Sequence, residues 1–196
     1  MPPEQAPAAT RRADAERNRN RILAAARSAF ADPEMEISMA EVSRRAGVGM
    51  ATLYRNFPGR QDLLEALYTD EVNAVCQAAE ALGGETPGAT FTAWLRRFFA
   101  FGTSKRHIAA ELLEHTDRSD PLFENSRSRV IAVGRPLLAA AQRTDEVRAD
   151  LVLEQVLDMV IALTRIQGDA HYLEPILQAA LDGLRPPGDP RRPKSP

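Results

Sequence analysis

The sequence contains little cysteine, little lysine and no long apolar run, and each shortage excludes a class of protein. The single cysteine among 196 residues, Cys76, cannot form a disulfide within the chain, so a reducing, cytoplasmic location is expected. No apolar segment approaches membrane-spanning length, and the first residues lack the apolar core of a signal peptide. Only Lys105 and Lys194 are lysines, and the net charge is -2, so any affinity for DNA must come from a local basic face.

Motifs of catalysis are missing as well. There is no phosphate-cradling glycine loop, no nucleophile elbow and no H-E-x-x-H pair. The nearest constellation is His107, Glu111 and His115, whose spacing places all three on one helical face. His107 and His115 would lie roughly 12 Å apart along that helix, too far for one metal ion to hold both. The sequence therefore predicts no enzyme, no metal site and no cofactor.

The stretch 38–62, SMAEVSRRAGVGMATLYRNFPGRQD, carries the strongest local pattern in the chain. Ser38 can cap a helix, and Glu41 can reach back to complete a capping box. Gly47 ends that helix where a left-handed residue is needed. Leu53 then belongs to the apolar face of a second short helix. Two short helices joined by a tight turn that contains glycine are typical of a helix-turn-helix.

The second of these helices, at about 50–56, has an outer face suited to the major groove of DNA. Its outward side chains are small, hydroxylated or cationic, and none is acidic. Such a face can approach base edges closely and offers donors to bases and phosphates. The alternative interpretation is a solvated helix on an all-α core. The complete pattern of cap, glycine turn and following basic residue favours the DNA-binding interpretation.

Residues 18–65 resemble the DNA-binding domain of the TetR (tetracycline-repressor) family of bacterial transcription regulators. The resemblance is carried by A-G-V at 46–48, T-L-Y at 52–54 and F-P-x-[KR]-x-x-L at 57–63. The chain departs from the family pattern where Arg60 replaces the usual lysine, although both residue types can hold a phosphate. Glycine also stands at two positions, 49 and 59, where the family usually has a residue with a capping side chain. Glycine remains an acceptable helix cap.

The resemblance and the outward face together give a set of residues expected to contact double-stranded DNA. Tyr54 and Arg60 are expected on phosphates, while Thr52, Arg55 and Met50 are expected at base edges. A cluster of arginines between 11 and 21 is either a solvated charged face or a basic arm on phosphate. The expected DNA-binding residues are Ser38, Arg44, Gly49, Met50, Ala51, Thr52, Tyr54, Arg55, Asn56 and Arg60.

The whole chain is expected to be all-α, with about nine helices and no strand. We expect a disordered N-terminal arm over 1–13 and the helix-turn-helix domain over 14–62. An effector-binding and dimerisation domain is expected over 63–185, followed by a disordered tail over 186–196. The first domain boundary falls inside a continuous helix that begins at about residue 60. Other helices are expected at about 14–31, 86–104, 107–116, 120–142, 150–166 and 171–184.

The last two helices are broadly apolar, and their faces exceed what one neighbour can cover, so we expect a homodimer through a four-helix bundle. The expected interface residues are Leu153, Val156, Leu157, Val160, Leu173, Ile176, Leu177 and Leu181. The aromatic-rich middle of the chain suits a cavity for an apolar or aromatic small molecule. The expected effector-binding residues are Leu67, Trp94, Phe98, Phe101, His107, Glu111, His115, Phe123, Asp158 and Arg165.

The family resemblance implies a transcriptional regulator, most simply a repressor. It would bind a palindromic operator as a homodimer and leave it when a small molecule enters the C-terminal domain. Two alternatives stay open. One is a DNA-binding dimer that senses no effector, and the other is an all-α protein-interaction module that keeps the helix-turn-helix as scaffold. The effector-free dimer differs from a ligand-responsive regulator in whether polar groups converge on a cavity. The protein-interaction module predicts no salt-dependent binding to duplex DNA.

Overall fold

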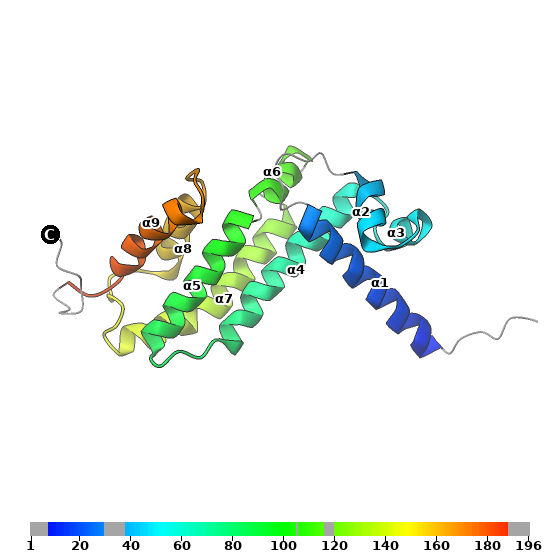
Figure 1. Cartoon of the computed structure of the whole chain (residues 1–196). Helices are drawn as coiled ribbons and strands as arrows, with labels where there is room; N and C mark the ends of the chain where they lie inside the picture. The colour runs from blue at the N-terminus through cyan, green and yellow to red at the C-terminus, as the bar shows by residue number, and fades with distance from the viewer. Residues whose placement is uncertain (1–7, 30–37, 105, 116–119, 188–196) are drawn as a thin grey trace, which may run out of the picture. The chain divides into compact units, whose positions relative to one another are not determined.

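The computed structural model describes residues 8–29, 38–104, 106–115 and 120–187 (Figure 1). Within these ranges the chain forms nine α-helices and no strand, which confirms the all-α prediction. No helix in this described part is both long and apolar enough to cross a membrane. The helices are α1 Ala8–Ala29, α2 Met39–Ala46, α3 Met50–Asn56, α4 Arg60–Ala81, α5 Pro87–Ser104, α6 Arg106–His115, α7 Pro121–Arg143, α8 Leu153–Leu163 and α9 Ala170–Asp182.

The helices divide between two compact units. Unit 1 takes in the chain up to Thr69 and also 107–115, so it holds α1–α3, the first turns of α4 and nearly all of α6. Unit 2 consists of 70–106 together with the chain after α6. The division therefore falls inside α4, between Thr69 and Asp70, whereas the sequence placed it near residue 62.

In unit 1, α1 packs on α2 and α3. The apolar positions that face inward, including Ile22 and Ala26 of α1 and Val42 of α2, are buried together with Leu53 of α3. Gly47 ends α2 with a φ of 62°, the left-handed conformation that glycine adopts without strain. This core fixes α3 so that the opposite side of that short helix faces outward.

Two expectations for unit 1 need correction. α1 begins at Ala8, so 8–13 is helical rather than a disordered arm; 1–7 lie outside the described residues. The capping box is only half formed. Ser38 Oγ accepts from the Glu41 amide at 3.2 Å, but the Glu41 carboxylate accepts from arginines one turn further along α2. A guanidinium attracts the carboxylate with a full positive charge, which a neutral backbone amide cannot supply.

In unit 2, α5 packs on α7 and α8, and α8 packs on α9. An aromatic row runs along α5, in which Phe91, Trp94, Phe98 and Phe101 follow one another with ring centroids 6.1 Å apart. Trp94 is fully buried, and its indole Nε1 donates to the backbone carbonyl of residue 75 on α4 at 3.2 Å. The row is therefore part of the packed core.

The last helix contains a proline. In the first turn of a helix the missing N–H of a proline costs nothing. α9 begins at Ala170, so Pro175 is its sixth residue and lies inside the helix. The predicted tail begins just after α9, and 188–196 lie outside the described residues.

Candidate nucleic-acid interface

The outer face of α3 is the surface that the sequence assigned to DNA. Leu53 has no exposed surface, whereas Met50 and Tyr54 are 39% and 47% exposed. Ala51 and Arg55 are exposed as well. The structure thus turns the side chains named from the sequence outward on one short, rigid helix.

The polar side chains of α3 are ordered by contacts within the helix. Arg55 Nη2 donates to the Thr52 hydroxyl at 2.9 Å, and Asn56 Nδ2 donates to the Thr52 carbonyl at 2.8 Å. Thr52 and Asn56 are half-buried, so the guanidinium of Arg55 projects from a fixed base. A guanidinium held in one orientation loses less conformational entropy when it binds a base edge or a phosphate.

A cluster of charges lies on α2, beside this face. Glu41 accepts from Arg44 Nε at 2.8 Å and from Arg45 Nε at 2.6 Å. These hydrogen bonds, first from Arg44 and then from Arg45, lower the pKa of Glu41 to about 2. The Arg44 side chain remains 73% exposed despite the pairing. The sequence identified Arg44 as a DNA contact but missed the carboxylate that holds it, although the i, i+3 spacing was the available signal.

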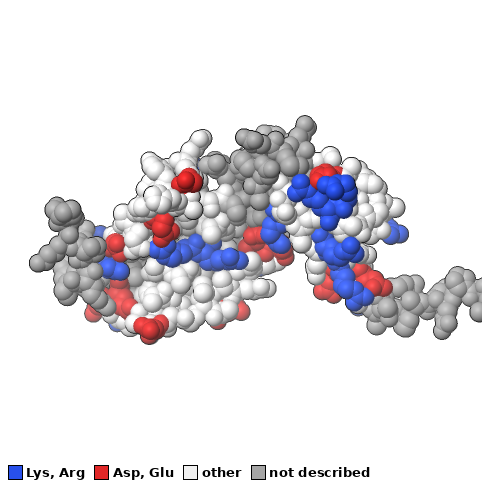
Figure 2. Space-filling model, viewed as in Figure 1, with Lys and Arg blue, Asp and Glu red and all other residues white. Residues whose placement is uncertain are grey.

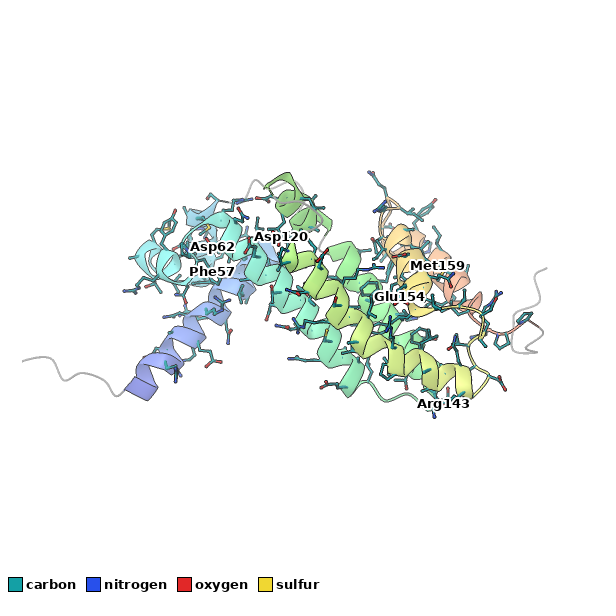
Figure 3. All side chains as sticks on the ribbon, turned by 180° about the vertical axis from the view of Figure 1, so that it is seen from behind. Phe57, Asp62, Asp120, Arg143, Glu154 and Met159 are labelled. Atoms are coloured by element: carbon teal, nitrogen blue, oxygen red, sulfur yellow. The ribbon has the colours of Figure 1, made fainter. Side chains whose placement is uncertain are left out.

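The beginning of α4 is less open than the sequence suggested. Arg60, expected on a phosphate, forms a two-pronged ion pair with Glu111 of α6, and Nη2 donates to Oε2 at 3.0 Å. The Gly59 amide at the helix start donates to Asp62 Oδ2 at 2.8 Å. Figure 3 shows Asp62 on the first turn of α4, close to Phe57 at the end of α3. Sequence spacing could not have revealed the Arg60–Glu111 pair, because its members are 51 residues apart.

Two arginines of the predicted basic arm have structural partners. The Arg19 guanidinium lies 4.7 Å from the centre of the Phe57 ring, and Arg21 Nη2 donates to the Gly47 carbonyl at 3.1 Å. They tie α1 to the turn and to the end of α3. Figure 2 shows Lys and Arg side chains gathered over this part of unit 1, with acidic side chains among them. The basic surface is therefore partly neutralised by its own chain.

The residues expected to bind an effector are divided between the two units. Leu67, His107, Glu111 and His115 belong to unit 1, and the other six belong to unit 2. Trp94 and Phe98 are buried in the core, Phe101 and Phe123 are half-buried, and Arg165 is exposed. Asp158 is 64% exposed and lies 3.4 Å from Arg127, as a surface ion pair. The side chains of His107 and His115 lie outside the described residues.

Two open grooves in unit 2 offer alternative ligand sites. The first, between α4 and α5, has a volume of about 220 Å³ and contains Phe101 from the predicted set. The second, of about 440 Å³, lies between α5, α9 and the α7–α8 turn, and its charged residues include Arg96 and Glu146. Arg96 already binds Glu174 of α9 at 2.5 Å. No group of three metal-ligating side chains occurs among the residues described.

The residues of the predicted dimer interface lie mostly on faces that the protomer itself buries. Seven of the eight named side chains are buried within the protomer itself: Leu153, Val156, Leu157, Val160, Leu173, Leu177 and Leu181. They hold α8 and α9 on their own chain, and only Ile176 is half-buried. The helical spacing of the apolar residues on α8 and α9 therefore marks the faces that are turned to the protomer's own core. The exposed surface lies on the other side of both helices.

Comparisons with known proteins found two family models that match separate stretches of the chain. The family model described as "Bacterial regulatory proteins, tetR family" matches residues 22–67. The model described as "Transcriptional regulator SbtR-like, C-terminal domain" matches residues 86–186. A search of curated proteins found no match.

Two solved structures are similar over nearly their whole length. The TetR transcriptional regulator SCO0520 from Streptomyces coelicolor is 31% identical, with a TM-score of 0.72, covering 86% of this chain and 99% of that one. A TetR regulatory protein from Mycobacterium vanbaalenii is 30% identical, with a TM-score of 0.71, covering 89% and 99%. RolR, solved in complex with the ligand resorcinol, is 20% identical with a TM-score of 0.54, covering 87% and 89%, and this likeness shows the fold alone.

Proposed function

Because this chain belongs to the TetR family of bacterial transcriptional regulators, which bind DNA and are not enzymes, we propose that it represses transcription as a homodimer on a palindromic operator and leaves the operator when a small molecule binds. The observation that carries the DNA-binding part is the outer face of α3. It combines exposed Met50 and Tyr54 with an ordered Arg55, all anchored by buried Leu53. A short helix with this face fits a major groove.

The contacts divide into two kinds. Arg55 and Thr52, joined by their hydrogen bond, read base edges, because a guanidinium can bind guanine through two acceptors at once. Tyr54, Arg44 and Arg60 hold phosphates and set the register of α3 in the groove. Ser38, Gly49, Ala51 and Asn56 complete the contact surface, where small side chains and amides allow close approach. The phosphate contacts, made by Tyr54, Arg44 and Arg60, supply affinity for any duplex.

The dimer forms through the outer sides of α8 and α9, which we call the α8–α9 face. On α8 this face consists of Val152 at the N-cap, which is 55% exposed, with Met159 and Ala162 at helical spacing. Figure 3 shows Met159 on α8. On α9 it consists of Tyr172, Pro175, Ile176 and Ala179, of which Tyr172 is 58% exposed. Small residues on α9 let a second helix approach closely, and a two-fold axis there buries the face against its own copy.

The effector enters the groove between α4 and α5. Phe101 ends the aromatic row, and the groove also touches residue 75, whose carbonyl accepts from Trp94. Glu71 and Arg97 supply charged groups at its walls. A volume of about 220 Å³ suits a compact molecule, such as a single aromatic ring with one or two polar substituents. The effector must bind the DNA-incompetent state more tightly than the competent one.

A duplex selection tests the proposal. The purified protein is incubated with random duplexes, the bound fraction is sequenced, and affinity is then measured against salt concentration. We expect a palindromic site, two protomers per duplex and an affinity that falls steeply with salt. Binding of any duplex with equal affinity would contradict operator recognition. Loss of all salt-dependent binding would instead support a protein-interaction module.

A second measurement tests the effector. Simple aromatic compounds are screened for release of the protein from the selected duplex, and Trp94 fluorescence is recorded for those that release it. As the sole tryptophan, Trp94 reports on the aromatic row alone. We expect a releasing compound to quench or shift this emission. A compound that releases the protein but keeps its affinity for Phe101→Ala would contradict the α4–α5 groove.

A further inference from the structure

The Arg60–Glu111 pair is the observation in unit 1 that the proposed function leaves unexplained. Arg60 opens α4, and both its Nε and its Nη2 donate to the Glu111 carboxylate of α6. The two side chains are 37% and 28% exposed, so the pair is partly shielded from water. A two-pronged guanidinium–carboxylate pair is stronger than a single contact and fixes the guanidinium in one plane.

The other donor at this helix end is occupied as well. The Gly59 amide precedes α4 and would face an anion at the helix start, but it donates to Asp62 Oδ2 at 2.8 Å. Thus the guanidinium and the amide that could together hold a phosphate are both bound by carboxylates of the same unit. A DNA phosphate can bind Arg60 fully only if a carboxylate oxygen gives up its place.

Resting on the proposed function, in which Arg60 holds an operator phosphate, we infer that Glu111 is an internal competitor of DNA for Arg60. In the free protein the guanidinium binds Glu111, and on the duplex it exchanges that carboxylate for phosphate oxygens. Carboxylate and phosphate each present two oxygens to the guanidinium fork, so the exchange needs no change in its hydrogen-bonding geometry. Glu111 therefore weakens binding to every duplex alike, because phosphates carry no sequence information.

α6 can open this pair without unfolding. Ile108 and Leu112, which flank Glu111 in the sequence, are four residues apart and so share one side of α6. They are 0% and 1% exposed. These apolar anchors keep α6 in place when the ion pair opens. Linkage then requires that any event which strengthens the Arg60–Glu111 pair weakens DNA binding, by up to the same factor. The pair is thus a point at which α6 sets the affinity of unit 1 for DNA.

The test compares Glu111→Gln with the unmodified protein on the selected operator and on an unrelated duplex. The variant keeps the shape of the side chain and removes its charge. We expect roughly three- to tenfold tighter binding to both duplexes, measured by fluorescence anisotropy. Glu65→Gln is the charge-matched control, since it removes one carboxylate of unit 1 whose oxygen accepts from Gln61 at 3.0 Å. Its effect should be less than twofold.

A double-mutant cycle separates competition from a general charge effect. Arg60→Ala should weaken binding to all duplexes, and adding Glu111→Gln to it should give no tightening beyond that of the Glu65 control. Glu111→Asp, which keeps the charge but shortens the side chain, should tighten binding by less than Glu111→Gln and replaces it if that variant unfolds on a thermal scan.

The outcomes are distinct. If the unmodified protein binds no duplex, the proposed function fails and this inference fails with it. If the unmodified protein binds and Glu111→Gln binds no tighter, only the competition is wrong. Equal tightening by Glu111→Gln with and without Arg60 would also overturn it, because Glu111 would then act on the DNA directly through its charge.

Discussion

The outer face of α2 and α3 in unit 1 and the groove beside α5 and α9 in unit 2 differ in how far apart in the sequence their polar contacts reach. On α2 and α3 the exposed groups are fixed by neighbours three or four residues away, as in Arg55 with Thr52 and Arg44 with Glu41. Beside α5 and α9 a contact joins distant segments, because Arg96 on α5 binds Glu174, 78 residues away. Short-range geometry can be inferred from spacing, whereas long-range geometry depends on the completed fold. A surface built from local contacts is therefore readable from sequence, and a cavity is not.

The largest expected effect is on the assembly of unit 2. Ile176→Arg places a guanidinium in the proposed α8–α9 face, where no residue three or four positions away on α9 carries a carboxylate. Burying an unpaired charge there should cost the dimer about 3 kcal/mol, or roughly 100-fold in its dissociation constant. Sedimentation equilibrium measures the change, and affinity for the palindromic operator should fall with it.

A matched control adds the same charge elsewhere on unit 2. Ala139→Arg lies at an exposed position of α7 and should leave the dimer intact. If both variants dimerise like the unmodified protein, the interface lies on another surface, and the face chosen from exposure is wrong.

The next effect concerns the core of unit 2. A methyl group at Gly134 of α7 would lie 2.4 Å from the Trp94 ring and 2.9 Å from Leu153. Gly134→Ala should therefore destabilise the protein by about 1–3 kcal/mol through overpacking. Thermal unfolding followed by Trp94 fluorescence measures it. Gly83→Ala is the control, because nothing lies within 4 Å of its added methyl group. Equal melting temperatures for the two variants would show that the Trp94 ring moves away from the added methyl group without loss of stability.

The third effect separates the two kinds of contact on unit 1. Arg55→Ala should cost about 1–3 kcal/mol on the selected operator and much less on unrelated duplexes. Arg44→Ala should weaken binding to all duplexes alike and lower the salt slope by about one. Anisotropy titrations of both variants on both duplexes, at several salt concentrations, provide the comparison. The same pattern for both variants would contradict the division between base and phosphate contacts.

These contrasts explain what the sequence could and could not predict. The number of helices and the outward face of α3 followed from caps, glycine and apolar spacing, which act within one or two turns. Apolar spacing on α8 and α9 indicates which faces are buried, but it does not say whether the same chain or a partner buries them. Leu153 and Leu177 are buried within their own chain. The Arg60–Glu111 pair had no local signal at all. Trp94 was assigned to a cavity for its size, whereas the core of unit 2 encloses it.

The smallest expected effect tests whether the local contacts of unit 1 add to its stability. Hydrogen bonds from Arg44 and Arg45 lower the pKa of Glu41 from the usual 4.5 to about 2. A carboxylate with a lowered pKa stabilises the folded state above its unfolded pKa, and this contribution is lost as the pH falls from about 4.5 through about 2. Glu41→Gln should therefore melt slightly below the unmodified protein at pH 7, with a difference that shrinks steadily below pH 4.5.

The cluster is open to solvent, so the difference should also shrink in high salt, and differential scanning calorimetry at several pH values can resolve it. Glu154→Gln makes the same comparison in unit 2, where a hydrogen bond from Arg135 lowers the pKa of Glu154. Glu154 reaches across 19 residues rather than along one helix, yet the same sign of pH dependence is expected because the direction of the pKa shift is the same. A difference in melting temperature between the unmodified protein and Glu41→Gln that widens toward acid pH would contradict this prediction. It would mean that the ionised carboxylate of Glu41 destabilises the folded protein despite its two arginine partners.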